Sequence, residues 1–135
     1  MAIINWDSSL SVNIGTIDDQ HKKLVGMVNS LHDSMKAGKA KDVMGILLSE
    51  LAAYTDYHFK TEEELFHKYN YSETAKHKAE HDALRKEVAK LKQQFENGDA
   101  VFTIELMYFL KDWLSKHIMG SDKQYSPFLT AKGVV

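Results

Sequence analysis

The sequence contains no cysteine among its 135 residues, and that absence removes several kinds of site at once. Disulfides, thiolate-bound metals and cysteine nucleophiles are excluded, so nitrogen and oxygen atoms must hold any metal. No apolar run reaches the roughly 18 residues that a helix needs to cross a bilayer. The net charge of −2 gives no basic excess of the kind that binds nucleic acid. We therefore expect a soluble cytoplasmic protein with neither nucleic acid nor a membrane as its partner.

The first residues have no basic start and no long apolar stretch, so no secretory signal is expected. The length suits a single domain over residues 1–135. Residues 1–17 are predicted to form an extended N-terminal arm that is apolar enough to pack on the body. Residues 18–120 are predicted to form that body. Residues 121–135 are predicted to be a C-terminal tail, which contains the only proline, Pro127.

Apolar residues recur at helical spacing in four segments, 19–37, 41–65, 73–97 and 102–119. Asp18 or Asp19 is expected to cap the first helix and Ser72 the third. Gly120 is expected to close the fourth helix. Four amphipathic helices with short connections favour an all-α fold, an up-down-up-down four-helix bundle.

Side chains that can bind metals continue two of these apolar stripes. His77 and His81 lie four residues apart and so project from one face of a helix. His58 and Glu62 repeat this spacing with a carboxylate in the second place. Such pairs also arise by chance, and a single histidine on an apolar stripe is most often a hydrogen-bonded core residue. The spacing alone therefore does not establish a site.

The position of the candidate ligands along the helices is more informative. His21 begins the first helix and His117 ends the fourth, while the two pairs lie where the second helix ends and the third begins. In an antiparallel bundle all of these positions fall at one end, where a metal would offset the cost of burying them. Asp122 follows His117 by five residues, which is 140° out of line on a regular helix. It can join only if the helix loosens near Gly120, through a π-type turn or an unwound end.

The number and type of these side chains narrow the choice of metal. Five imidazoles and two carboxylates are too many ligands for one ion, and structural zinc takes only four. Calcium and magnesium prefer oxygen atoms alone. Imidazole with carboxylate suits iron among other transition metals, and bundle cores hold carboxylate-bridged iron pairs.

The combined motifs resemble the ligand signature of the hemerythrin family, and the resemblance covers essentially the whole chain. They comprise His21 after Asp18-Asp19-Gln20, His58-x-x-x-Glu62, His77-x-x-x-His81 and His117-x-x-x-x-Asp122. The Trp6-Asp7 arm resembles the bacterial members. The resemblance implies a non-haem di-iron centre in which one iron is held by His77, His81 and His117.

The resemblance further implies that His21 and His58 hold the second iron and that Glu62 and Asp122 bridge the two. With an oxo or hydroxo bridge, these ligands fill all but one position of two six-coordinate irons. The vacancy lies on the iron with two histidines, and an open position is what a small ligand requires. Two further histidines, His32 and His67, are assigned to structure or solvent.

The function implied is reversible binding of dioxygen to the ferrous pair, for carriage, storage or delivery, and not enzymatic catalysis. The oxygen pocket is expected to be lined by apolar neighbours of the cluster: Leu24, Phe59, Trp113, Leu114, Ile118 and Met119. Two alternatives remain open. The domain could sense oxygen or redox state for a signalling protein, docked on it or fused to it, or it could be a di-iron redox enzyme.

Overall fold

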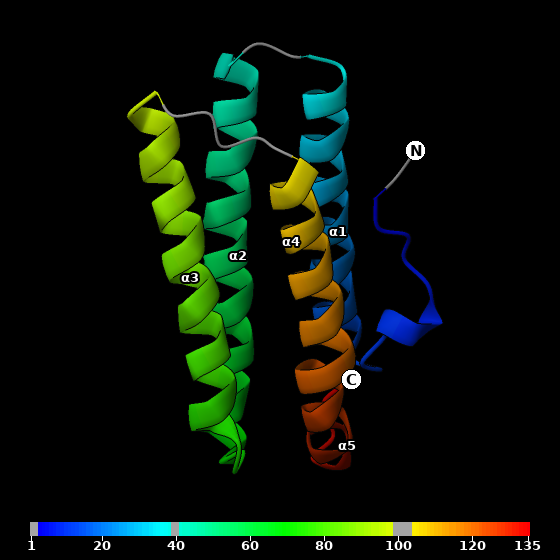
Figure 1. Ribbon diagram of the computed structural model, residues 1–135. Helices are drawn as coiled ribbons and strands as arrows, with labels where there is room; N and C mark the ends of the chain where they lie inside the picture. The colour runs from blue at the N-terminus through cyan, green and yellow to red at the C-terminus, as the bar shows by residue number, and fades with distance from the viewer. Residues whose placement is uncertain (1–2, 39–40, 99–103) are drawn as a thin grey trace.

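The structure is a computed structural model that describes residues 3–38, 41–98 and 104–135. Four long helices stand side by side (Figure 1). They are α1 (Gly15–Lys36), α2 (Lys41–Tyr69), α3 (Thr74–Glu96) and α4 (Ile104–Lys116). A π-helical turn, η2 (His117–Asp122), continues α4 and leads into α5 (Lys123–Ala131). The predicted all-α four-helix bundle is confirmed.

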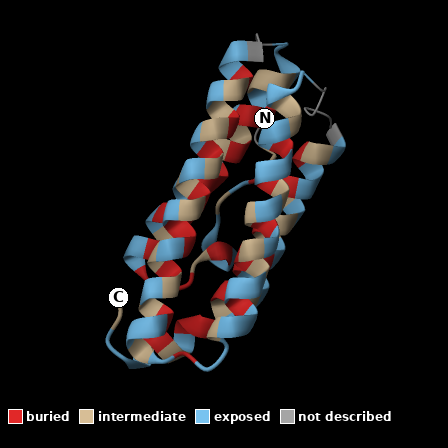
Figure 2. Ribbon diagram, turned by 90° about the vertical axis from the view of Figure 1, so that its left-hand side faces the viewer, coloured by how far each residue is buried: buried red, intermediate tan, exposed pale blue. Residues whose placement is uncertain are grey.

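The helices pack by burying one face each. α1 packs against both α2 and α4, and α2 packs against α3. In Figure 2 the buried residues form stripes on the sides where the helices meet, and the exposed residues lie on the outside. Leu31 and Met107, for example, are fully buried, and burial of such a side chain contributes roughly 1.5–3 kcal/mol. The connection between α2 and α3 lies at the same end of the bundle as α5 (Figure 1).

The N-terminal arm packs on the body as predicted, although it is not extended throughout. It contains a short 3₁₀ helix, η1 (Ser8–Leu10). The Ile4 N–H donates to Asn29 Oδ1 at 3.0 Å, and the Asn29 amide donates back to the Ile4 carbonyl at 2.9 Å. Ile4 and Leu10 are buried against the helices. Hydrogen bonds between the Ile4 backbone and the Asn29 side chain, together with apolar contacts, hold the arm in place.

The first helix begins four residues earlier than the sequence suggested. The Asp18 N–H already bonds to the Ile14 carbonyl, so Asp18 lies in the first turn and is not an N-cap. Its carboxylate instead accepts hydrogen bonds from the Val12 N–H and the Ser11 hydroxyl. The aspartate therefore fastens the arm to α1 and also favours the helix N-terminus by its negative charge.

The second helix continues past residue 65, where it was predicted to end. Asn70 ends it with a left-handed φ of 55°. The Tyr71 N–H returns to the Phe66 carbonyl at 2.9 Å, which is the pattern of a Schellman C-cap. The predicted cap Ser72 is exposed, and the N-cap of α3 is Glu73, which makes no side-chain cap bond.

The segment predicted to be a tail contains α5. The helix does not stop at Gly120, because the π-helical turn carries it on without a break. Pro127 lies inside α5, and its neighbour Ser126 donates its hydroxyl hydrogen bond to the Val12 carbonyl of the arm. Tyr125 and Leu129 are fully buried, so the apolar face of α5 is part of the core.

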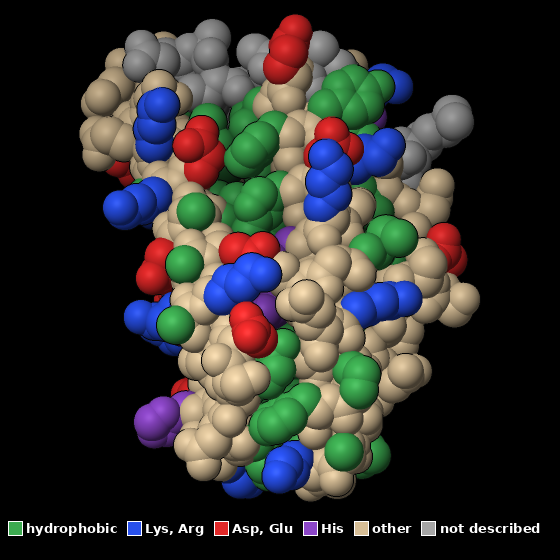
Figure 3. All heavy atoms as spheres, turned by 60° about the horizontal axis from the view of Figure 1, so that its bottom comes forward, with side chains coloured by type: hydrophobic (Ala, Val, Ile, Leu, Met, Phe, Trp, Pro, Cys, Tyr) green, Lys and Arg blue, Asp and Glu red, His purple; other side chains and the backbone are tan. Residues whose placement is uncertain are grey.

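No helix within the described ranges is long and apolar enough to cross a lipid bilayer. On the face that comes forward in Figure 3, acidic and basic side chains are mixed and hydrophobic side chains lie between them.

Candidate metal centre

The seven predicted ligands meet inside one end of the bundle, and all of them are buried. They form two overlapping groups, in each of which the candidate ligand atoms lie within 4.8 Å of one another. One group consists of Glu62, His77, His81, His117 and Asp122. The other group consists of His21, His58, Glu62 and Asp122. The two carboxylates thus belong to both groups, and each histidine belongs to one.

Helical periodicity explains how most of these residues come together. The pairs on α2 and α3 are i and i+4 pairs, which lie on one face of a helix. His117 and Asp122 are the first and last residues of the π-helical turn η2, whose wider turn brings residues five apart onto one face. As a result, His117 Nε2 lies 3.1 Å from Asp122 Oδ1. The loosened helix near Gly120 is confirmed.

The two carboxylates face both groups in different ways. Asp122 Oδ2 lies 3.0 Å from His21 Nε2, while Oδ1 lies 2.9 Å from His77 Nε2. Asp122 therefore reaches the two groups with different oxygens. Glu62 uses a single oxygen, because Oε1 lies 3.1 Å from His58 Nε2 and 3.3 Å from His81 Nε2.

These close nitrogen–oxygen pairs are not hydrogen bonds. Several candidate ligand atoms are buried and have no hydrogen-bond partner within the described residues. They are Glu62 Oε1, both Asp122 carboxylate oxygens, and the Nε2 atoms of His21, His77, His81 and His117. Leaving such groups unpaired would cost several kcal/mol in total. Ligands at right angles around a metal, each about 2.1 Å from it, lie about 3.0 Å apart. The donor atoms therefore fit a pair of metal ions.

Burial raises the pKa values of the two cluster carboxylates, Glu62 and Asp122, and the neighbouring imidazoles lower them. Burial and the neighbouring Asp122 raise the pKa of Glu62, but the imidazoles of His58 and His81 outweigh them and hold it below its ordinary value. Burial likewise opposes ionisation of Asp122, yet His117 and His21 hold the pKa of Asp122 well below its usual range. Both carboxylates are therefore ionised and ready to bind a cation.

A second layer of polar residues surrounds the cluster. Gln20 Oε1 lies 2.6 Å from His58 Nδ1, Glu63 Oε2 lies 2.8 Å from His81 Nδ1, and the Tyr125 hydroxyl donates to Glu62 Oε2. No pattern in the sequence marks Gln20 or Glu63 as part of the site. Each is adjacent to a candidate ligand, but no local pattern reveals contacts to a different helix.

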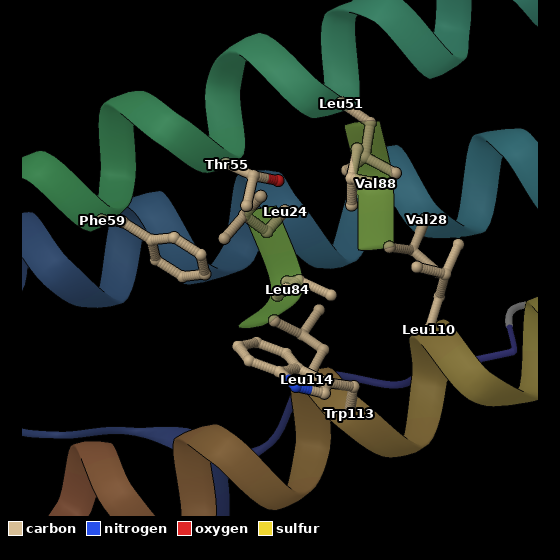
Figure 4. Close-up of a pocket in the computed structure, with 10 residues that line it drawn as sticks. All are labelled: Leu24, Val28, Leu51, Thr55, Phe59, Leu84, Val88, Leu110, Trp113 and Leu114. Atoms are coloured by element: carbon tan, nitrogen blue, oxygen red, sulfur yellow. The ribbon is translucent and has the colours of Figure 1, made fainter. Parts of the chain in front are cut away.

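An apolar cavity of about 30 Å³ lies between α1, α2, α3 and α4 (Figure 4). Two of the side chains that line it, Phe59 and Trp113, stack on His81 and His117 of the cluster. Four residues of the predicted oxygen pocket line it, Leu24, Phe59, Trp113 and Leu114. Six further side chains complete the wall: Val28, Leu51, Thr55, Leu84, Val88 and Leu110. A water-sized sphere needs about 10–15 Å³, so the cavity suits a molecule of two or three atoms.

Two predicted pocket residues do not line this cavity. Ile118 is buried in the core cluster that contains the arm, and Met119 is half exposed. Both residues lie in the π-helical turn η2. The two remaining histidines lie outside the cluster: His67 is exposed in the last turn of α2, and His32 is buried on α1.

Residues 12–129 match the family described as the hemerythrin HHE cation binding domain. The chain is 40% identical to a bacteriohemerythrin of Methylococcus capsulatus over 97% of its own length and 100% of that protein. It is 38% identical to a hemerythrin-like protein of Naegleria gruberi, over 93% of this chain and 92% of that protein.

A crystal structure of wild-type hemerythrin superimposes with a TM-score of 0.91 and 39% identity. The similarity covers 96% of this chain and 99% of that one. The family match, the identities and the shared fold extend over nearly the whole sequence. This chain therefore belongs to the hemerythrin family.

Proposed function

We propose that the protein binds dioxygen reversibly at a non-haem di-iron centre. The observation that supports this most strongly is the pair of overlapping ligand groups, in which most of the atoms that face the cluster are buried and have no hydrogen-bond partner among the described residues. Two shared carboxylates suit two neighbouring ions, since each carboxylate can serve both. The apolar cavity between the helices is suited to a small uncharged ligand.

In this proposal His77, His81 and His117 hold one iron and His21 and His58 the other, with the carboxylates shared. When bound, the ferrous pair supplies the electrons that dioxygen takes up on binding and returns on release. Five neutral imidazoles leave the site less anionic than a carboxylate-rich site. That balance favours return of the oxygen over its cleavage, and it supports a carrier, store or delivery protein more than an enzyme.

The residues around the centre have separate tasks. Phe59 stacks on His81, with ring centroids 3.8 Å apart and planes 5° from parallel, so the ring of His81 is held in position. Trp113 stacks in the same way on His117 at 4.5 Å. Leu24 and Leu114 belong to the apolar wall of the cavity, and an apolar cavity tends to exclude water. Exclusion of water slows proton entry and so limits irreversible oxidation.

One observation supports the sensor alternative. Tyr125 on α5 donates to Glu62, and the next residue, Ser126, donates to Val12 of the arm. A change at the shared carboxylate could therefore reach the arm through two adjacent residues. A cytoplasmic location, a single-domain organisation and a signalling partner stay predictions.

The test is reconstitution of the metal-free protein with ferrous iron under anaerobic conditions. We expect two irons per chain, and visible charge-transfer bands that appear with oxygen and disappear when oxygen is removed, over many cycles. Fast irreversible oxidation would favour sensing or redox catalysis. His77→Ala should reduce the iron content, whereas His67→Ala, at an exposed position, should not. Equal iron content in both variants would overturn the site assignment.

A further inference from the structure

His81 is held at the nitrogen that faces away from the cluster. Glu63 Oε2 lies 2.8 Å from His81 Nδ1, and Arg85 Nη1 donates to the same oxygen at 3.0 Å. We propose that Glu63, fixed by Arg85, is a positioning residue that orients His81 and strengthens it as an electron donor to iron. The proposal rests on the proposed function, because it takes His81 to be an iron ligand.

The contact with Glu63 selects the ring tautomer. An ionised carboxylate can only accept hydrogen bonds, so the proton of a neutral His81 must be on Nδ1. Nε2 then keeps its lone pair. This atom is buried, has no hydrogen-bond partner in the described part of the chain, and lies 3.3 Å from Glu62 Oε1. Glu63 therefore directs the lone pair of His81 into the cluster. A carboxylate behind a ligating histidine also raises the basicity of that ligand.

Aromatic contacts prevent the ring from turning away. Phe59 stacks flat on one face of His81, while Glu63 holds its edge. The guanidinium of Arg85 lies 5.2 Å from the centre of the Phe59 ring. The same arginine thus contacts both groups that restrain His81.

Arg85 is itself anchored at three points. Besides Glu63, its Nε donates to Asp56 Oδ1 at 3.0 Å and its Nη1 to Asp82 Oδ1 at 2.8 Å. Asp56 is on α2 and Asp82 on α3, so the guanidinium joins the two helices beside the cluster. Glu63 and Arg85 are only 17% and 23% exposed, which makes their pairing stronger than that of a surface ion pair.

The carboxylate partner distinguishes His81 from the other candidate ligands. His58 has a neutral partner, the amide oxygen of Gln20. His117 Nδ1 lies 3.8 Å from Glu80, beyond hydrogen-bond distance. Among the described residues, His81 is thus the candidate ligand whose Nδ1 has a carboxylate within hydrogen-bond reach. The extra electron donation is directed to the iron of the three-histidine group, the one expected to have no vacancy.

Two substitutions separate charge from position. Glu63→Gln keeps the size and an acceptor oxygen but removes the charge, so it should stabilise the ferric form less than wild-type does. We expect the ratio of ferric to ferrous iron at equilibrium to fall about tenfold, which raises the reduction potential by about 59 mV. Glu63→Ala also removes the acceptor, and the affinity for ferrous iron should fall about 10–100-fold. The measurements are an anaerobic titration of ferrous iron against a chelator and a redox titration followed by visible absorption.

Glu64→Gln is the matched control, since it removes the same charge one residue along, at an exposed position. It should leave affinity and potential unchanged. Arg85→Met as a single substitution should lower the affinity for iron. Added to Glu63→Gln, it should lower that affinity little further, because Arg85 acts through Glu63. Circular dichroism of each metal-free variant establishes that it is folded, and the isosteric Glu63→Gln remains informative if Glu63→Ala does not fold.

The outcomes that overturn the inference are specific. Wild-type affinity and potential in both Glu63 variants would overturn it, as would an equal shift in Glu64→Gln. These results differ from failure of the proposed function, in which the wild-type protein itself would not retain two irons.

Discussion

The phenol of Tyr125 donates a hydrogen bond to Glu62 Oε2 and leaves Oε1 facing His58 and His81. Burial, with the carboxylates of Glu62 and Asp122, holds the pKa of Tyr125 well above its ordinary value, so the phenol remains a donor. Tyr125 therefore determines which oxygen of Glu62 is presented to the imidazoles. This contact also joins α5 to the metal cluster.

Tyr125→Phe should destabilise the metal-free protein by about 1–3 kcal/mol, because it leaves a buried carboxylate oxygen without its donor. Urea unfolding followed by circular dichroism measures the loss. Tyr57→Phe is the control, since Tyr57 is 58% exposed and its hydroxyl should contribute little. Equal stability of the two variants would show that the phenol does not stabilise Glu62.

The metal-free protein should become less stable as the pH rises above neutrality. Burial lowers the pKa of His117, but Asp122 and Glu62 outweigh it and raise the folded value above 6.5. When the pKa of a histidine is higher in the folded than in the unfolded state, its protonation stabilises the folded state. This stabilisation is complete at pH values below the unfolded-state pKa, and it is lost as the pH rises through the folded-state pKa. Unfolding free energy should therefore be larger at about pH 6 than at about pH 8, and His117→Gln should flatten the difference.

Loading with ferrous iron should reverse this trend. Imidazoles must lose their protons to bind a metal, so binding releases protons and weakens in acid. The stabilisation that iron adds, measured as the rise in the urea midpoint under anaerobic conditions, should therefore grow from about pH 6 to about pH 8. A larger gain in acid would contradict the assignment of histidines as ligands.

Two helical glycines should respond in opposite ways to alanine. An added Cβ at Gly26 on α1 meets no atom within 4 Å, so Gly26→Ala should stabilise the protein by about 1 kcal/mol through helix propensity. An added Cβ at Gly45 on α2 would lie 2.5 Å from the Phe95 ring. Gly45→Ala should therefore be destabilising, as thermal unfolding of the metal-free proteins can test. The reverse order would mean that the Phe95 ring moves away without cost.

His32 should be replaceable by an apolar residue. It is 7% exposed, and its Nδ1 has no hydrogen-bond partner within the described residues. His32→Leu removes that unpaired atom, and it should stabilise the protein by about 1 kcal/mol without changing its iron content. A loss of iron in this variant would show that His32 is not the structural residue that its absence from both ligand groups implies.

Local patterns in the sequence predicted much of the fold and of the candidate site. The pairs His58/Glu62 and His77/His81 could be placed together because the helical period fixes the direction of residues four apart. The ends of the helices were less accurate. Asp18 looked like a cap, but its carboxylate bonds to the arm, and Asn70 rather than residue 65 ends α2.

By itself the sequence determined the helical faces, the chemical types of the buried donors and the end of the bundle where they meet. Only the tertiary structure decided that η2 is a π-helical turn that brings Asp122 to His117, and that α5 returns to the core. It alone also decided that Glu63 and Arg85 hold His81 from outside. The physical reason is that a helical period reports directions along one helix, whereas these contacts depend on how side chains of different helices fit together.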